Sequence, residues 1–362
     1  MAEIRIKNVK KVYPTGAVGV SEVNMEIADG EFTVITGGAG SGKSALIRMI
    51  CGLDDVTEGE IVMDGAVINE LMPKDRDIAI VVKSLGLFPN LNVFENLAYG
   101  LKLRKMPKNE IDARVNDVAR ILDLTDVLSR KPKNVSTLER QRVLLGRAIA
   151  RCPKLIILDD PFSDFNDSIR QTLCGDILKI QKRMNVNFIY VTKSAAEAFE
   201  LADKIAYFDG GKLVQYGSVE EIYDAPKTIP IARFFGQPPV NLFIGKFVKE
   251  DSLKFSSSNF TLELDKSLEE AVKDYVESGK EVQLSIRAED LSLGSDFEGT
   301  MQEVAVYGDK QLVAFSVEGD DSAHYALVGS DFEFKKGEKI GLRFDLSHAN
   351  YYDLISEMNL LK

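Results

Sequence analysis

The segment Gly37-Gly38-Ala39-Gly40-Ser41-Gly42-Lys43-Ser44 decides the fold class of this 362-residue chain. It matches the pattern G-x-x-x-x-G-K-[ST], in which glycines leave backbone N–H groups free to surround phosphate oxygens. The apolar run 31–36 precedes it and the helical stretch 43–51 follows it, which is the context the pattern requires. We therefore predict a phosphate-binding loop between a strand and a helix. Lys43 is expected to reach the β- and γ-phosphates of a nucleotide, and the Ser44 hydroxyl to ligate Mg²⁺.

A second short apolar segment, 155–158, ends in Asp159. A buried strand that delivers a carboxylate at its C-terminal end supplies the other half of such a site, because this Asp helps to hold Mg²⁺. Strand-like runs and helical stretches alternate from residue 1 to about residue 235, with a further strand at 187–192. This alternation predicts an α/β domain with a parallel or mixed sheet and helices on its faces.

Part of this domain has a different pattern. Residues 108–122 form a long charged helical stretch, a loop surrounds Pro132, and a second helix is expected from Glu139 onward. We therefore predict a helical subdomain at about 88–150, inserted into the α/β domain.

Glycine and proline interrupt the chain at 236–239, and short alternating segments follow. We therefore place a nucleotide-binding domain at 1–236 and a small β-rich domain, a barrel or a sandwich, at 237–362. In this second domain we expect four side chains to pack or face solvent rather than bind a ligand: His324, His348, Tyr351 and Tyr352.

The composition excludes several classes of protein. The formal net charge is −11, so a nucleic-acid binder or a polybasic membrane-surface protein is not expected, because phosphate surfaces repel a net anion. The longest apolar runs fall far short of the ~20 residues that cross a bilayer, and the N-terminal segment lacks the apolar core of a signal peptide. Three scattered cysteines, Cys51, Cys152 and Cys174, indicate a reducing, cytosolic compartment.

The chain resembles the ATP-binding subunits of ABC importers, and most closely the maltose and sugar-importer branch, over nearly its whole length. The resemblance rests on the phosphate loop, on Asp159 and on the segments 76–79, 87–96, 140–149, 201–203 and 285–291. It implies ATP and Mg²⁺ as cofactors, an ABC-type ATPase fold, and an OB-like regulatory domain at the C-terminus. It also implies that Tyr13 stacks on adenine, that Ala45 belongs to the nucleotide-binding residues, and that Ser136 contacts nucleotide held by an opposite subunit.

Four single residues and one five-residue motif depart from the family pattern. Lys83 stands where the family has a Gln that touches Mg²⁺ and the attacking water, and Lys193 stands where it has a switch His. Asp160 replaces the catalytic Glu, and Asn166 replaces an Asp in the loop that follows. The signature Leu-Ser-Gly-Gly-Gln reads Val-Ser-Thr-Leu-Glu at 135–139. Its Ser-x-x-Glu pattern still makes a capping box, so the helix is expected to form while its phosphate contact is weakened.

These substitutions predict a subunit that binds nucleotide and hydrolyses it poorly. We take Asp160, Lys83 and Lys193 to occupy the catalytic positions, and two arrangements of the lysines stay open. Their ammonium groups could hold the γ-phosphate and crowd the Mg²⁺ site, or they could point to solvent. Two other functions also stay open: a nucleotide-sensing regulatory subunit without turnover, and a competent ATPase rebuilt around Asp160 and Lys193.

The resemblance implies partners and a location. The segments 76–79 and 87–96 resemble the region of the family that faces the membrane subunits, so they imply integral-membrane permease subunits as partners. An extracellular solute-binding protein would act indirectly. A second, intact ATPase subunit in a heterodimer is expected more than a homodimer, because a homodimer would carry the substitutions at both sites. The chain is then expected at the cytoplasmic face of the cell membrane, supporting uptake of a carbohydrate or polyol.

Overall fold

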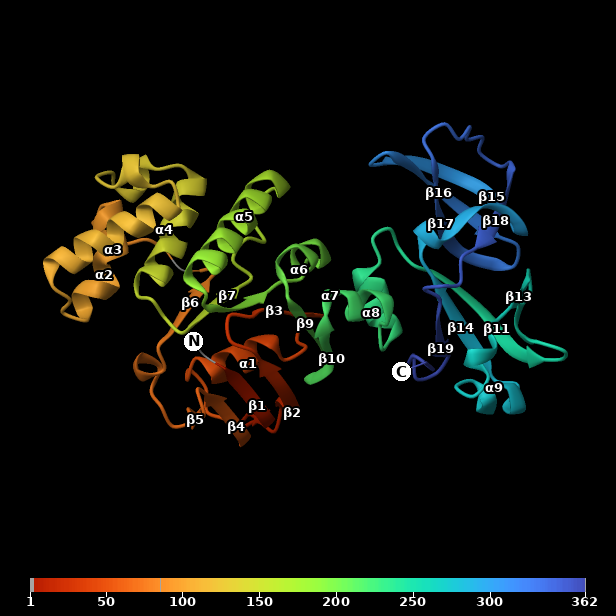
Figure 1. Ribbon diagram of the computed structural model, residues 1–362, viewed down its shortest axis with the longest axis horizontal. Helices are drawn as coiled ribbons and strands as arrows, with labels where there is room; N and C mark the ends of the chain where they lie inside the picture. The colour runs from red at the N-terminus through yellow and green to blue at the C-terminus, as the bar shows by residue number, and fades with distance from the viewer. Residues whose placement is uncertain (1–2, 85, 362) are drawn as a thin grey trace. The chain divides into compact units, whose positions relative to one another are not determined.

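The computed structural model describes residues 3–84 and 86–361, and it divides into two compact units, Met1–Val219 and Glu220–Lys362 (Figure 1). The first unit is built on a six-stranded sheet in the order β10-β9-β3-β8-β7-β6. Neighbouring strands from β9 to β6 run parallel, and β10 is antiparallel at the edge. The strands are β3 (Phe32–Gly37), β6 (Ile78–Val82), β7 (Leu155–Asp159), β8 (Asn187–Val191), β9 (Lys204–Asp209) and β10 (Lys212–Ser218).

The first unit also contains a four-stranded antiparallel sheet in the order β2-β1-β4-β5. Its strands are β1 (Ile4–Val12), β2 (Val18–Ile27), β4 (Glu58–Met63) and β5 (Ala66–Val67). The inward side chains of both sheets and of the helix α1 (Lys43–Ile50) form one apolar core. This core fixes the start of α1, and with it the phosphate loop.

Three helices lie within the range 88–150, where a helical subdomain is predicted. The helices α2 (Val93–Leu103), α3 (Lys108–Ile121) and α4 (Thr137–Ala150) contact one another and lie together in Figure 1. The helices α5 (Asp167–Met184) and α6 (Ala195–Leu201) follow β7 and β8. Short 3₁₀ turns are η1 (Pro73–Asp75), η2 (Thr125–Val127) and η3 (Pro132–Asn134). No helix in the described ranges is both long enough and apolar enough to cross a bilayer.

The boundary between the units lies at Val219/Glu220, upstream of the expected position near 236. It falls within α7 (Val219–Asp224), and α8 (Ile229–Phe235) belongs to the second unit. Ile229 and Ala232 of α8 are buried against Tyr352, whose hydroxyl donates a hydrogen bond to the Pro226 carbonyl at 3.1 Å. The glycine and prolines at 236–239 therefore form the turn from α8 into the β-rich unit rather than a linker between units.

The second unit consists of two antiparallel sheets that share one core rich in phenylalanine. The five-stranded sheet, in the order β13-β12-β11-β14-β19, contains β11 (Asn241–Lys249), β12 (Leu253–Ser257), β13 (Thr261–Glu263), β14 (Glu281–Ile286) and β19 (Asn350–Asp353). The four-stranded sheet, in the order β17-β16-β15-β18, contains β15 (Leu291–Tyr307), β16 (Lys310–Val317), β17 (Asp320–Gly329) and β18 (Lys339–Phe344). Short helical segments are η4 (Lys266–Leu268), α9 (Lys273–Ser278) and η5 (Ala288–Asp290).

Candidate functional site

Four neighbouring parallel strands end at the same edge of the six-stranded sheet, and the predicted site residues follow them. β3 leads into the phosphate loop, β7 ends at Asp159, β6 precedes Lys83, and β8 precedes Lys193. In open α/β sheets this edge is where ligands bind. A cavity of about 690 Å³ lies there, lined by Ala39, Gly40, Lys43, Ser44, Val82, Lys83, Ser84, Asp159, Asp160, Asp164, Val191, Thr192 and Lys193.

Lys43 is held inside the phosphate loop. Its Nζ donates hydrogen bonds to the carbonyl oxygens of Gly37 and Gly38, at 2.9 and 2.6 Å, and to the Ser41 hydroxyl at 3.0 Å. Burial lowers the pKa of Lys43, and the nearby ammonium group of Lys193 lowers it further. A cation that is desolvated and close to a like charge gains from an incoming anion, so this position favours a phosphate.

The glycines of the loop serve two purposes. Gly37 has φ +133°, and a Cβ there would lie 2.0 Å from the carbonyl oxygen of Phe208, so a side chain is excluded by close backbone packing. A Cβ on Gly38 or Gly40 would meet no other atom within 4 Å. The backbone at these two positions is therefore open to the approach of a phosphate group.

Lys83 has a partner that the sequence did not reveal. Its Nζ lies 2.7 Å from Oδ1 of Asp164, in the loop between β7 and α5. This hydrogen bond raises the pKa of Lys83 and keeps the side chain charged. Both side chains line the cavity and remain substantially exposed, and the ion pair offsets part of the positive charge that Lys83 would bring to a phosphate.

Asp159 and Asp160 lie side by side at the end of β7. Burial, and then the neighbouring Asp160, raise the pKa of Asp159. Asp160 has a left-handed backbone, φ +48°, and its N–H donates to the Val191 carbonyl at 3.0 Å. This hydrogen bond fixes the Asp160 backbone to the end of β8, next to Thr192 and Lys193.

The loop that carries Lys193 is anchored by a buried carboxylate, Glu197, in α6. Its Oε2 accepts hydrogen bonds from the Tyr190 hydroxyl at 2.9 Å and from the Thr192 hydroxyl at 2.5 Å. Arg170 of α5 lies 3.6 Å from its other oxygen. Sequence reasoning missed Glu197, although the pattern Ser194-x-x-Glu197 marks a helix start and Ser194 does cap α6.

Outside the phosphate loop, three predicted residues do not line this cavity: Tyr13, Ala45 and Ser136. Tyr13 and Ala45 both lie close to Gly19. A Cβ added to Gly19 would be 2.9 Å from the Tyr13 ring and 3.2 Å from the Ala45 Cβ. The Lys11 ammonium group lies 5.4 Å from the centroid of the Tyr13 ring. Ser136 caps α4, where its hydroxyl accepts from the Glu139 N–H at 3.2 Å. The role of each of these residues toward a nucleotide stays a prediction.

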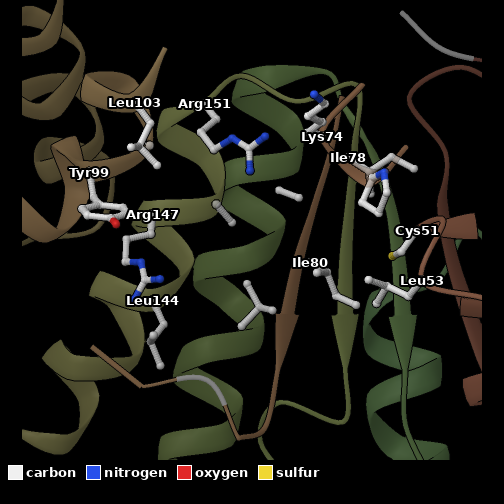
Figure 2. A pocket seen from close by; sticks show the side chains of 15 residues that line it. Cys51, Leu53, Lys74, Ile78, Ile80, Tyr99, Leu103, Leu144, Arg147 and Arg151 are labelled. Carbon is white, nitrogen blue, oxygen red and sulfur yellow. The ribbon is translucent and has the colours of Figure 1, made fainter. Parts of the chain in front are cut away.

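A second concave surface lies between the helical subdomain and the sheet (Figure 2). It encloses about 420 Å³ and includes Ile78 and Ala79 from the segment that resembles a membrane-facing region. Figure 2 shows Tyr99, Leu103, Arg147 and Arg151 on the helical side, across from Ile78, Ile80 and Leu53.

The segment 87–96 beside this groove is held in place by Asn96. Its fully buried amide donates to the carbonyl oxygens of Phe88, Leu91 and Asn92 and accepts from the Phe88 N–H. Arg76, by contrast, is buried and donates to the carbonyl oxygens of Met49 and Ile50 at the end of α1. Arg76 therefore stabilises α1 and does not line the groove.

The comparisons with known proteins cover both units. The family model of the ABC transporter matches residues 20–163. The oligosaccharides import ATP-binding protein MsmX of Bacillus subtilis (strain 168) is 34% identical over 99% of this chain and 100% of its own length. The sn-glycerol-3-phosphate import ATP-binding protein UgpC of Bordetella pertussis is 39% identical over 86% of this chain and 85% of its own length.

Two solved structures share the fold of the first unit. The ATP-binding cassette MJ0796, solved in a post-hydrolysis state with ADP and Pi, has a TM-score of 0.52 and 27% identity, covering 60% of this chain and 98% of its own. The cbiO1 protein of Clostridium perfringens, part of the complex cbiONQ, has a TM-score of 0.57 and 23% identity, covering 60% and 89%. With the near full-length similarity to MsmX, these findings show that the chain belongs to the ABC transporter family, in the branch of the sugar-importer ATP-binding subunits.

Proposed function

We propose that this chain is the nucleotide-binding subunit of an importer and couples ATP binding to uptake of a carbohydrate or polyol through membrane permease subunits. The observation that carries the proposal is the convergence of Lys43, Ser44 and Asp159 on one cavity at the ends of the parallel strands. The names of MsmX and UgpC support a sugar or a polyol phosphate as the transported solute. The transported molecule itself would contact other subunits, so its identity is not encoded in this cavity.

The residues at the site fit a nucleotide with Mg²⁺. The Ser44 hydroxyl and the Asp159 carboxylate line the cavity beside Lys43, and hydroxyl and carboxylate oxygens are ligands that Mg²⁺ prefers. The raised pKa of Asp159 reflects a half-buried carboxylate whose charge is incompletely balanced, which a divalent cation would correct. Mg²⁺ bound with ATP would neutralise charge on the β- and γ-phosphates. Ser44 would hold it directly, and Asp159 would orient its hydration shell.

We propose that hydrolysis at this site is slow. The Asp160 carboxylate is one methylene shorter than a Glu, and its backbone is fixed by the hydrogen bond to Val191. A general base must lie within hydrogen-bond reach of the proton it takes, and its contribution is typically ~10²–10⁴-fold. Lys83 and Lys193 carry no acceptor that could orient the attacking water, because an ammonium group only donates.

The start of α4 supports the same conclusion. The capping box predicted from the sequence is confirmed: Ser136 accepts from the Glu139 N–H, and the Glu139 carboxylate accepts from the Ser136 N–H at 2.6 Å. These hydrogen bonds lower the pKa of Glu139 and keep it ionised. An ionised carboxylate in the first turn opposes the attraction of a helix N-terminus for phosphate. A nucleotide on an opposite subunit would therefore be held weakly by this helix.

The groove in Figure 2 supports a permease partner. Leu53, Tyr99 and Leu103 are substantially exposed there, which is unusual for large apolar side chains grouped on one surface. Arg147 and Arg151 lie among them, and burial lowers the pKa of both. This combination fits an amphipathic helix that carries an acidic residue, so we place the chain at the cytoplasmic face of the membrane through such a contact.

The proposed assembly is a heterodimer with an intact ATP-binding subunit. In it, this chain would contribute a complete phosphate loop and receive a functional signature helix from its partner. The alternative is a regulatory subunit that senses nucleotide without turnover. The Lys83–Asp164 ion pair favours this alternative, because Lys83 occupies the position of the catalytic Gln. Both functions share the same nucleotide site and differ in whether the partner drives transport.

Purification of the chain from membranes of its native cell tests the proposal. We expect integral-membrane subunits and a second ATP-binding subunit with an intact Leu-Ser-Gly-Gly-Gln signature to copurify. Leu103→Asp should release the membrane subunits while ATP binding is retained, and Leu103→Met serves as the matched control. A fully active transporter that contains only this ATP-binding chain would contradict the heterodimer and the impaired hydrolysis together.

A further inference from the structure

The second unit contains a polar pocket that the nucleotide site does not use. It encloses about 370 Å³ and is lined by β11, β14, the start of β17, the turn 257–259 and Arg233 of α8. Its volume is within the range of ~300–1,000 Å³ that small-molecule sites occupy. All of its lining residues belong to the second unit, so the pocket is complete within that unit.

A stacked pair of rings lines this pocket. The His324 imidazole lies parallel to the Phe243 ring, with centroids 4.4 Å apart and an interplanar angle of 7°. His324 is 1% exposed, and its Nε2 lies 3.0 Å from Oδ2 of Asp320. The other oxygen of Asp320 accepts from the Ser322 N–H at 2.8 Å. The carboxylate is therefore held in a fixed orientation at the pocket wall.

These contacts define the hydrogen-bonding character of His324. An ionised carboxylate only accepts, so Nε2 carries the proton that it donates to Asp320. Burial lowers the pKa of His324, so the ring is neutral near pH 7 and Nδ1 carries a lone pair. Nδ1 is buried and, among the described residues, has no hydrogen-bond partner. An unsatisfied buried acceptor of this kind is uncommon and favours a donor that arrives with a ligand or with water.

Other polar groups that line the pocket are also available to form hydrogen bonds with a ligand. Within the described part of the chain, the Gln283 carboxamide and the Arg233 guanidinium group have no side-chain partner. The Asn259 amide nitrogen donates to the Glu318 carbonyl at 3.0 Å, which leaves its oxygen free to accept. The described lining therefore offers both donors and acceptors, and its charged side chains are Arg233 and Asp320.

We propose that this pocket binds a small, neutral, polyhydroxylated compound, a sugar or a polyol. A hydroxyl group both donates and accepts, which matches the mixture of carboxamide, carboxylate, imidazole and guanidinium groups. A phosphorylated or carboxylated ligand fits less well, because the Asp320 carboxylate would repel it and only Arg233 would attract it. The site is separate from the nucleotide cavity and does not depend on the proposed importer function.

Saturation-transfer NMR and calorimetry on the full chain test this assignment. The probes are maltose and sorbitol as neutral ligands and sn-glycerol 3-phosphate as an anionic one. We expect saturable binding of at least one neutral probe, weakened roughly three- to tenfold by Gln283→Ala through loss of one or two hydrogen bonds. Gln302→Ala, which removes a carboxamide elsewhere in the same unit, should leave it unchanged. Lys43→Ala should also leave it unchanged, since that residue belongs to the nucleotide site.

A second variant, His324→Phe, keeps an aromatic ring against Phe243 and removes both nitrogens. We expect it to weaken binding as well, with the thermal unfolding midpoint measured to confirm that the unit is folded. If His324→Phe fails to fold, Gln283→Ala still decides. Absence of saturable binding of both neutral probes at millimolar concentration would overturn the proposal. So would binding only of sn-glycerol 3-phosphate, or binding of a neutral probe that Gln283→Ala leaves unchanged.

Discussion

The Lys83 ammonium group lies 2.7 Å from the Asp164 carboxylate, joining the end of β6 to the loop before α5 beside the phosphate loop. The resemblance places Lys83 where the family has a Gln, so the substitution introduces a charge and the ion pair offsets part of it. The site thus contains three lysines and three aspartates: Lys43, Lys83, Lys193, Asp159, Asp160 and Asp164. We expect the balance among these charges to determine how strongly the cavity binds nucleotide with and without a metal.

Asp164→Asn should free the charge of Lys83 for a nucleotide. We expect ATP affinity measured in EDTA to rise roughly two- to fivefold, which is the scale of an exposed ion pair. Lys83→Gln should not raise it, and both variants should unfold at nearly the wild-type temperature because both side chains are substantially exposed. Titration of a fluorescent ATP analogue measures the affinities. An unchanged or reduced affinity of Asp164→Asn in EDTA would show that Lys83 does not reach the phosphates.

Substitution of Lys193 is a second test of the charge balance between the lysines and aspartates of the cavity. Lys193 lines the same cavity as Lys43, and its ammonium group lowers the pKa of Lys43. We expect Lys193→Ala to weaken ATP binding in EDTA more than in Mg²⁺, because the metal takes over part of the neutralisation. Lys182→Ala, an exposed lysine near the end of α5, is the control. Equal losses with and without Mg²⁺, or no loss, would place Lys193 away from the phosphates.

Glu197→Ala should destabilise the first unit. Its buried carboxylate accepts from Tyr190 and Thr192, and removal leaves both hydroxyls without that acceptor. The expected decrease in the free energy of unfolding is about 1–3 kcal/mol, measured by urea titration. Glu197→Gln retains one acceptor oxygen and should lose less. An unchanged free energy of unfolding in Glu197→Ala would mean that water or another group replaces the carboxylate as the acceptor.

The pKa of His324 should lie below the usual value of 6.5, because burial outweighs the opposing effect of Asp320. NMR titration of the two imidazoles measures it, with His348→Gln assigning the signals. Between its folded pKa and 6.5, the unfolded His324 binds more protons than the folded one. Stability should therefore fall as the pH decreases from 6.5, and His324→Phe should lack this contribution. Asp320→Asn should lower the pKa of His324 further, and a pKa above 6.5 would contradict the burial argument.

Much of the first unit follows from local sequence patterns. The expected elements 31–36, 43–51, 108–122 and 155–158 agree with β3, α1, α3 and β7 within one or two residues. Their apolar periodicity and the glycine pattern are local, so no long-range contact is needed to predict them. The capping box at Ser136 is predictable for the same reason, since both partners lie within one helical turn.

The missed features depend on contacts between distant parts of the chain. Lys83 and Asp164 are 81 residues apart in sequence, and neither residue type signals the other. The burial of His324 follows from its packing on Phe243, in the other sheet of the same unit. The expected boundary at 236 relied on glycine and proline, and the packing of α8 against Tyr352 places those residues inside the second unit.

We propose that the chain binds ATP and hydrolyses it slowly. The most direct measurement is ATP binding and steady-state hydrolysis on the purified chain with Mg²⁺, beside a variant restored at six positions: Lys83→Gln, Thr137→Gly, Leu138→Gly, Glu139→Gln, Asp160→Glu and Lys193→His. We predict similar binding in both and a turnover roughly 10²–10⁴-fold higher in the restored variant, lost again with Lys43→Ala. Wild-type turnover equal to that of the restored variant, and abolished by Lys43→Ala, would contradict the claim and make Asp160 a competent base.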